Sequence, residues 1–232
     1  MKTLGGRQKT ARCRWVVCAC ALASTMVAAS WARAAGESAV TVSVRVYNYA
    51  KVSRRVVGSA EREASRIFTA AGIETTWLDC LTSQAQVQSG PATAQRFTAA
   101  DLGCDLPVRG AAVSLRILSS SMVPTKDFTD EMFGFATGSD LASVFYQRVI
   151  DVAWNVDKDG NEIPLILGDV IAHELGHLLL GTNSHSPAGI MCANWDQEHV
   201  QQALRGHQLF SFKQAALMRA TVVRRNSQIA QP

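Results

Sequence analysis

The first half of the chain alternates between strand-like and helix-like patterns of hydrophobic residues. Residues 40–47 read VTVSVRVY, in which apolar and polar side chains alternate as they do in a half-buried strand. Residues 53–71 repeat apolar side chains at helical spacing before Gly72, a residue type that commonly ends helices. Residues 73–78 form a second strand-like run. This order predicts a strand–helix–strand unit at the start of the fold.

The second half of the chain begins with strands and ends with helices. A stretch rich in Gln, Ala, Ser, Thr and Gly, residues 82–108, is typical of a loop. Three strand patterns follow, at residues 112–118, 133–137 and 142–147. The middle one is short and contains glycine, which suits an edge strand. Three helical patterns end the chain, at residues 164–180, 196–205 and 211–225. Together the two halves predict an α+β fold.

The N-terminal segment has the pattern of an export signal. Residues 1–14 carry basic side chains and no acidic one, residues 15–29 are apolar, and residues 30–34 read SWARA, with small residues where a cleavage site needs them. The apolar run has 15 residues, fewer than the ~20 that a membrane span requires. We therefore expect a signal peptide over residues 1–34, cleaved near Ala34, and a mature protein exported to the periplasm or secreted, without a membrane anchor. An uncleaved anchor is the alternative.

Removal of this leader changes the charge of the chain. Residues 1–34 carry six of the 23 Lys and Arg residues and none of the 19 Asp and Glu residues. The mature chain then has 17 basic and 19 acidic residues, a net charge of −2. The sequence therefore gives no reason to expect nucleic acid as a partner.

The cysteines outside the leader are Cys80, Cys104 and Cys192. Disulfides persist in the oxidising compartments that exported proteins enter. Three cysteines allow three pairings, of which we favour Cys80–Cys104, because this bond would close the loop-like stretch between the two residues. Cys192 would then be a free, buried thiol. In the alternative, all three cysteines stay reduced.

The segment HELGH, residues 173–177, carries the strongest chemical signal in the chain. His173 and His177 are four residues apart on a predicted helix, so both imidazoles lie on one face, where they can bind one zinc ion. Glu174 is placed to take a proton from a water molecule that the zinc ion activates. A pair of buried, hydrogen-bonded core histidines is the alternative.

The extended motif HELGHLLLGTNSH, followed by GIM at residues 189–191, resembles the metzincin metallopeptidases, a clan of the zincins. Their pattern is H-E-x-x-H-x-x-G-x-x-H followed by a methionine turn, and here each of the last two spacings is one residue longer. The resemblance implies that His185 is the third zinc ligand and that Met191 lies under the metal. Gly181 falls on the zinc face of the helix, where a side chain would crowd the metal, and glycine can also adopt the positive φ that ends a helix.

The same resemblance implies a fold and a function. The fold would be a zincin-like domain over residues 35–232, with a mixed, mostly parallel sheet in an N-terminal subdomain of about 38–181 and a small helical C-terminal subdomain of about 182–232. The function would be that of an exported zinc metalloendopeptidase with one catalytic Zn²⁺ and a peptide or protein substrate. The edge strand at 133–137 could pair with an extended peptide. Because the first strand follows the cleavage site almost directly, we expect no pro-domain and no zymogen stage.

Three alternatives stay open. In the gluzincins, a related group, the third ligand is a glutamate on a later helix, and Glu198 lies 21 residues beyond His177 on a predicted helix. The chain could also be a non-catalytic zinc-fold binding module, although a structural zinc ion has no need of Glu174 and is usually closed by four protein ligands. The third alternative is a zinc hydrolase that acts on a non-peptide amide.

Overall fold

The computed structural model describes the following parts of the chain: residues 40–80, 104, 110–123, 132–156, 158–193 and 195–229. These residues belong to one compact unit, Ser38–Pro232. The expected leader and most of the 82–108 loop lie outside the described residues. The division into subdomains at residue 182 stays a prediction.

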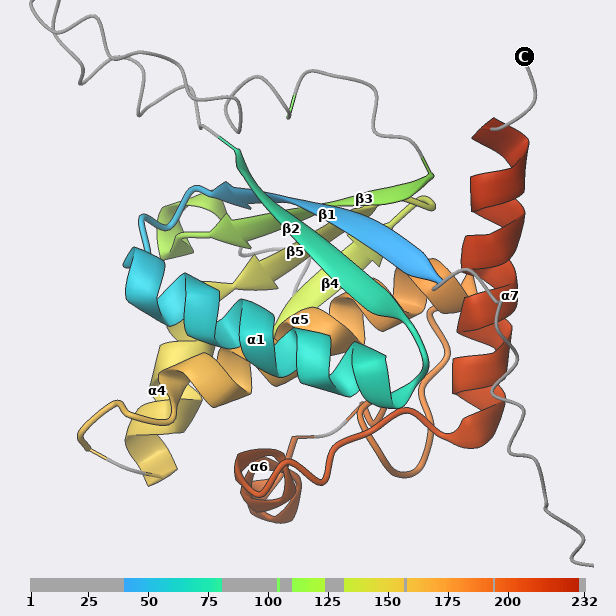
Figure 1. Ribbon diagram of the computed structural model, residues 1–232. Helices are drawn as coiled ribbons and strands as arrows, with labels where there is room; N and C mark the ends of the chain where they lie inside the picture. Colours follow the sequence, from blue (N-terminus) through green and yellow to red (C-terminus); the bar gives the residue numbers. More distant parts are fainter. Residues whose placement is uncertain are drawn as a thin grey trace, which may run out of the picture. The chain divides into compact units, whose positions relative to one another are not determined.

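Five strands form one sheet in the order β2-β1-β3-β5-β4 (Figure 1). They are β1 (Thr41–Asn48), β2 (Glu74–Cys80), β3 (Ala111–Leu118), β4 (Gly134–Thr137) and β5 (Leu141–Phe145). The pairs β1–β2, β1–β3 and β3–β5 are parallel, whereas β4 is antiparallel to β5. The predicted α+β fold with a mixed, mostly parallel sheet is therefore confirmed, and β4 is an edge strand as expected.

The helices α1 (Arg54–Ala70) and α5 (Ile163–Leu180) lie along the same face of the sheet (Figure 1). In β1, buried and half-buried side chains alternate, because every second residue of a strand points to the face that the helices cover. Ser53 caps α1, since its hydroxyl accepts a hydrogen bond from the backbone N–H of Val56 at 3.4 Å. Gly72 follows the helix with a φ of 75°. The predicted strand–helix–strand unit is confirmed.

Helix α5 is hydrophobic on nearly all sides. By length and composition it could cross a membrane. However, 14 of its 18 residues are buried within the protein, which is the behaviour of a helix at the centre of a globular core. Burial on all sides fixes the position of every side chain that α5 carries, including those of the HELGH segment.

Helix α4 (Tyr146–Val156) corrects the sequence prediction. The strand predicted over 142–147 is β5, but it ends at Phe145, and the chain continues as a helix. The residues that this helix turns towards the core recur at helical spacing: Val149, Val152, Ala153 and Val156. The sequence analysis missed this pattern.

The C-terminal part of the chain forms α6 (Gln197–Leu204) and α7 (Phe212–Ile229), in agreement with the predicted helices. Earlier in the chain, the 3₁₀ turn η1 (Ser120–Met122) follows β3. A capping box begins α7, because the backbone N–H of Gln214 donates to the Ser211 hydroxyl at 3.3 Å and the backbone N–H of Ser211 donates to the Gln214 side chain at 2.8 Å. Further along α7, the Asn226 side chain accepts from the backbone N–H of Ala111 and donates to the Thr41 carbonyl. These bonds fix α7 against the first residues of β1 and β3.

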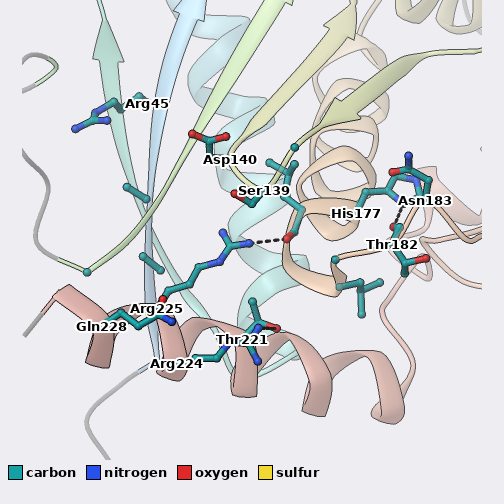
Figure 2. A pocket seen from close by; sticks show the side chains of 17 residues that line it. Arg45, Ser139, Asp140, His177, Thr182, Asn183, Thr221, Arg224, Arg225 and Gln228 are labelled. Atoms are coloured by element: carbon teal, nitrogen blue, oxygen red, sulfur yellow. Dashed lines mark hydrogen bonds between the residues drawn. The ribbon is translucent and has the colours of Figure 1, made fainter.

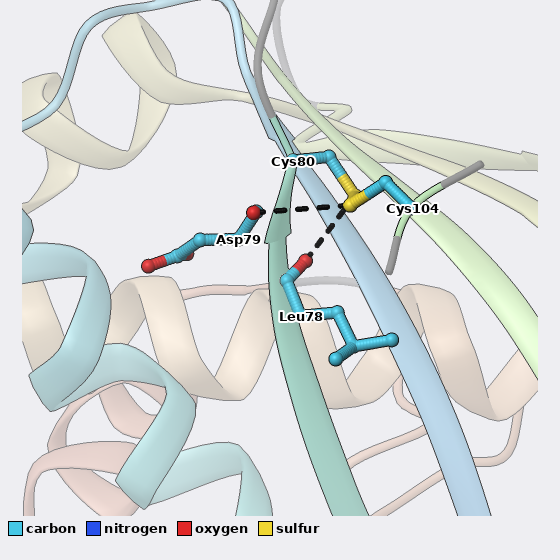
Figure 3. Close-up of a disulfide and its surroundings, with 4 residues drawn as sticks. All are labelled: Leu78, Asp79, Cys80 and Cys104. Atoms are coloured by element: carbon cyan, nitrogen blue, oxygen red, sulfur yellow. Dashed lines mark hydrogen bonds between the residues drawn. A yellow bond between two sulfur atoms is a disulfide. The ribbon is translucent and has the colours of Figure 1, made fainter. Parts of the chain in front are cut away.

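Cys80 and Cys104 form the disulfide that the sequence analysis favours (Figure 3). Their Cα atoms are 5.7 Å apart, and the bond ties the end of β2 to a residue 24 positions further along. Cys192 is buried outside any disulfide, as expected.

Candidate metal centre

Three histidines converge at the C-terminal half of α5. One ring nitrogen from each of His173, His177 and His185 lies within 4.8 Å of the other two. His173 and His177 are buried on α5, whereas His185 comes from the exposed loop that follows the helix. The ring of His185 lies 5.3 Å from that of His173 and 4.9 Å from that of His177, centroid to centroid. The structure thus brings together the three residues that the sequence proposes as ligands.

Backbone carbonyls orient the two buried histidines. The Nδ1 atom of His173 lies 2.7 Å from the Ile190 carbonyl oxygen, and that of His177 lies 2.9 Å from the Thr182 carbonyl oxygen. Because a carbonyl oxygen can only accept, each Nδ1 carries the proton and donates it. Each Nε2 atom therefore presents a lone pair towards the third histidine, which is the tautomer that a metal ligand needs.

This arrangement does not suit a hydrogen-bonded pair of neutral core histidines. The two Nε2 atoms are 3.1 Å apart, and a hydrogen bond between them would require one ring to carry protons on both nitrogens. Burial, chiefly, lowers the pKa of His173 to about 4 and also lowers the pKa of His177, so both rings are neutral at pH 7. Two lone pairs face each other at a distance close to the ~3.3 Å between nitrogen ligands of a tetrahedral zinc ion. The donor set therefore fits Zn²⁺.

Gly181 ends α5 and starts the loop that carries His185. Its φ is 67°, and its backbone N–H donates to the His177 carbonyl at 2.9 Å. A Cβ atom built on Gly181 would meet no protein atom within 4 Å. The left-handed conformation therefore explains the glycine, and the expectation that a side chain here would crowd the metal stays a prediction.

The segment after His185 forms a tight turn. The backbone N–H of Ser186 donates to the Met191 carbonyl at 2.8 Å, and that of Cys192 donates to the Gly189 carbonyl at 3.0 Å. Gly189 has a φ of 76°, a conformation that favours glycine. The sequence analysis places Met191 in this turn, and the turn also supplies the Ile190 carbonyl that orients His173.

Met191 is fully buried against the helix that carries the two histidines. A Cβ atom built on Gly176 would lie 2.7 Å from the Met191 sulfur, so the methionine occupies the space that the missing side chain leaves. Gly176 directly precedes His177. Met191 therefore supports the helix at the ligand-bearing turn, and its place under the metal stays a prediction.

Glu174 is buried beside the edge strand. A Cβ atom built on Gly134 of β4 would lie 2.8 Å from Oε1 of Glu174 and would also meet the Ser143 carbonyl oxygen. Burial raises the pKa of Glu174 to about 8. The sequence analysis did not predict that Gly134 makes room for Glu174. The only sign of this in the sequence is a glycine inside a short strand.

We expect Gly134→Ala to lower catalytic activity at least tenfold without loss of metal. The added methyl group must displace either the Glu174 carboxylate or the β4–β5 pairing, and a small misplacement of a catalytic group is costly. Gly58→Ala is the matched control, because its Cβ would meet only Arg62 Nη1 at an ordinary 3.7 Å. Steady-state kinetics and metal content of the two variants test this; equal kinetics in both would contradict the positioning role of Gly134.

A pocket of about 780 Å³ opens over the three histidines and Glu174. Residues of β4 form one wall, and Trp195 forms part of another. The Trp195 ring packs against Phe133 at 5.4 Å and lies 6.5 Å from the His173 ring. The candidate metal centre therefore faces a cleft that runs beside the edge strand.

The alternative ligand Glu198 lies elsewhere. It is exposed on α6, and its carboxylate accepts a hydrogen bond from Gln202 at 3.2 Å. Its neighbour His199 pairs with Asp196 at 2.7 Å. Within the described part of the chain, only the three histidines form a close group of potential metal ligands.

No protein-family model matches the chain, and no curated protein matches it in sequence. Among solved structures, it is similar to a zinc-dependent peptidase from Methanocorpusculum labreanum (strain Z), with 14% identity, a TM-score of 0.47, and coverage of 75% of this chain and 99% of that one. It is also similar to archaemetzincin from Methanopyrus kandleri, with 16% identity, a TM-score of 0.44, and coverage of 80% and 97%. Both TM-scores are below 0.5, so the assignment of a function rests on the residues of this chain.

Proposed function

We propose that the protein is an exported, zinc-dependent endopeptidase of the metzincin type. His173, His177 and His185 hold the zinc ion, and Glu174 is the general base. The observation that carries the proposal is the convergence of three imidazoles beside the buried side chain of Glu174 in one cleft. Three protein ligands leave a fourth position for water or substrate, as in catalytic zinc sites.

In the proposed mechanism, Glu174 is the base and the zinc ion is the Lewis acid. A zinc ion supplies Lewis-acid chemistry, because it lowers the pKa of water and polarises a carbonyl group. Glu174 takes up the proton of the attacking water and then delivers it to the leaving amine. Burial raises the pKa of Glu174, and a higher pKa makes its carboxylate a stronger proton acceptor.

Strand β4 provides a docking edge for an extended peptide. Among the strands that the structure describes, it pairs only with β5, as the last strand of the sheet, and its residues line the cleft. A peptide could add to this edge by backbone hydrogen bonds, which recognise an extended chain largely without regard to side chains. This geometry favours cleavage within a peptide over action on a small non-peptide amide.

Export rests on the leader pattern and on the disulfide between Cys80 and Cys104. Structural disulfides persist in oxidising compartments, so the bond is consistent with a protein that leaves the cytoplasm. N-terminal sequencing of the protein recovered outside the cytoplasm should find a new start close to residue 35. Retention of residues 1–34 would contradict cleavage and favour the anchor.

The proposed activity can be tested with the mature chain, residues 35–232. We expect it to bind one zinc ion per chain and to cleave members of a quenched-fluorescence peptide library. A chelator should abolish cleavage, and added zinc should restore it. Folded, zinc-loaded protein that cleaves no peptide would favour the binding module or the hydrolase of non-peptide amides.

A further inference from the structure

A second pocket, of about 900 Å³, adjoins the candidate metal centre (Figure 2). Figure 2 shows α7 on one side of it, the turn at Ser139 and Asp140 on another, and the end of α5 with Thr182 and Asn183 on a third. His177 and Asn183 line both pockets. The second pocket is therefore within reach of a substrate that occupies the metal centre.

The described lining of this second pocket carries a net positive charge. Arg224 and Arg225 line it from α7, and Asp140 is the single acidic residue among the described lining residues. Burial lowers the pKa of Arg225, and the neighbouring charge of Arg224 lowers it further, while Asp140 opposes the change. Arg224 and Arg225 thus outnumber the one described carboxylate, and a bound anion would be stabilised there.

The walls of the pocket are held in place by hydrogen bonds between distant elements. The guanidinium of Arg225 donates from Nη2 to the Leu178 carbonyl at 2.8 Å (Figure 2), which joins α7 to the last turn of α5. Asn226 fixes the next position of α7 to the sheet through Ala111 and Thr41. The bond to Leu178 holds the Arg225 guanidinium in place before a ligand binds, so this arginine is preorganised.

We infer that this pocket binds a carboxylate of the peptide substrate, either its C-terminus or an acidic side chain, beside the bond that is cleaved. The inference rests on the proposed peptidase function. The planar guanidinium matches the two oxygens of a carboxylate, and the hydroxyl groups of Ser139, Thr182 and Thr221 in the same lining can add hydrogen bonds. Because His177 and Asn183 line both pockets, a peptide that lies along β4 and crosses the metal centre can extend into this one.

The variant Arg224→Gln removes one charge from the pocket with little risk to the fold. Arg224 is exposed, and its described side-chain contact is a long hydrogen bond of 3.4 Å to the Thr221 hydroxyl. Arg225 is unsuitable, because its loss would also release the Leu178 carbonyl. Arg55→Gln is the matched control, since it removes the same charge from an exposed position of α1, which does not line the pocket.

The substrates are peptides that differ only in one carboxylate. One pair has a free or an amidated C-terminus, and the other has Glu or Gln downstream of the cleaved bond. We expect the wild type to cleave the carboxylate member of at least one pair about 10-fold better in kcat/KM, mainly through KM. Arg224→Gln should abolish this preference, whereas Arg55→Gln should keep it.

The outcomes distinguish the two possible sources of the carboxylate. They also distinguish a failure of this inference from a failure of the proposed peptidase function. Discrimination within the first pair identifies the C-terminus, and discrimination within the second identifies the side chain. No discrimination in either pair, or an equal loss in Arg224→Gln and Arg55→Gln, would overturn the inference. Fluorescence anisotropy with the same peptides and zinc-loaded protein measures binding without hydrolysis. If no peptide is cleaved but binding still depends on the carboxylate and on Arg224, only the proposed peptidase activity is contradicted. Equal binding of the peptides with and without the carboxylate would contradict the proposed carboxylate site.

Discussion

Glu174→Gln is expected to lower kcat for peptide hydrolysis by at least ~100-fold, the lower range of what general acid–base catalysis contributes. The glutamine keeps the size of the side chain but cannot accept the proton of the attacking water. Zinc content should stay at the wild-type level, because the three potential ligands within 4.8 Å of one another are histidines. Steady-state kinetics with a cleaved library peptide, together with metal analysis of the same sample, checks both expectations.

Glu198→Gln is the matched control for this substitution. It makes the same chemical change on α6, at an exposed residue that pairs with Gln202. We expect wild-type kinetics and zinc content in this variant. Activity in Glu174→Gln equal to that of the wild type would refute the role of Glu174 as base. Loss of zinc in Glu198→Gln would instead support Glu198 as a zinc ligand.

His185→Ala is expected to weaken zinc binding by more than the ~10–100-fold typical of losing a group that only orients a ligand. The substitution leaves two nitrogen ligands on α5. His185 is exposed on a loop, so its loss should leave the fold intact, which far-ultraviolet circular dichroism can verify. Competition with a chromophoric chelator measures the zinc affinity.

His207→Ala serves as the comparison for His185→Ala. His207 is also an exposed histidine outside the helices, and it lies outside the group of three. Its substitution should leave zinc affinity unchanged. If His185→Ala bound zinc as tightly as the wild type, the third ligand would have to lie elsewhere and the metzincin resemblance would lose its main support.

The local parts of the fold and site follow from the sequence, because they depend on the geometry of single elements. Alternation over residues 40–47 predicts β1, since side chains of a strand point to opposite faces. The four-residue spacing of His173 and His177 places both rings on one face of a helix whatever surrounds it. Helix α4 was missed although its inward residues Val149, Val152, Ala153 and Val156 recur at helical spacing, because the strand pattern read over residues 142–147 overlaps its first turn.

The remaining parts of the site depend on the path of the chain between elements, which no periodicity encodes. The Ile190 carbonyl orients His173 from 17 residues away, and Gly134 of strand β4 makes room for Glu174 of helix α5. The basic pocket needs Arg225 to reach Leu178 across 47 residues. Sequence alone therefore determined which residue types carry the chemistry and which helix holds them, whereas the tertiary structure decided the groups that orient them and the second pocket, because those contacts form only when loops bring separate elements together.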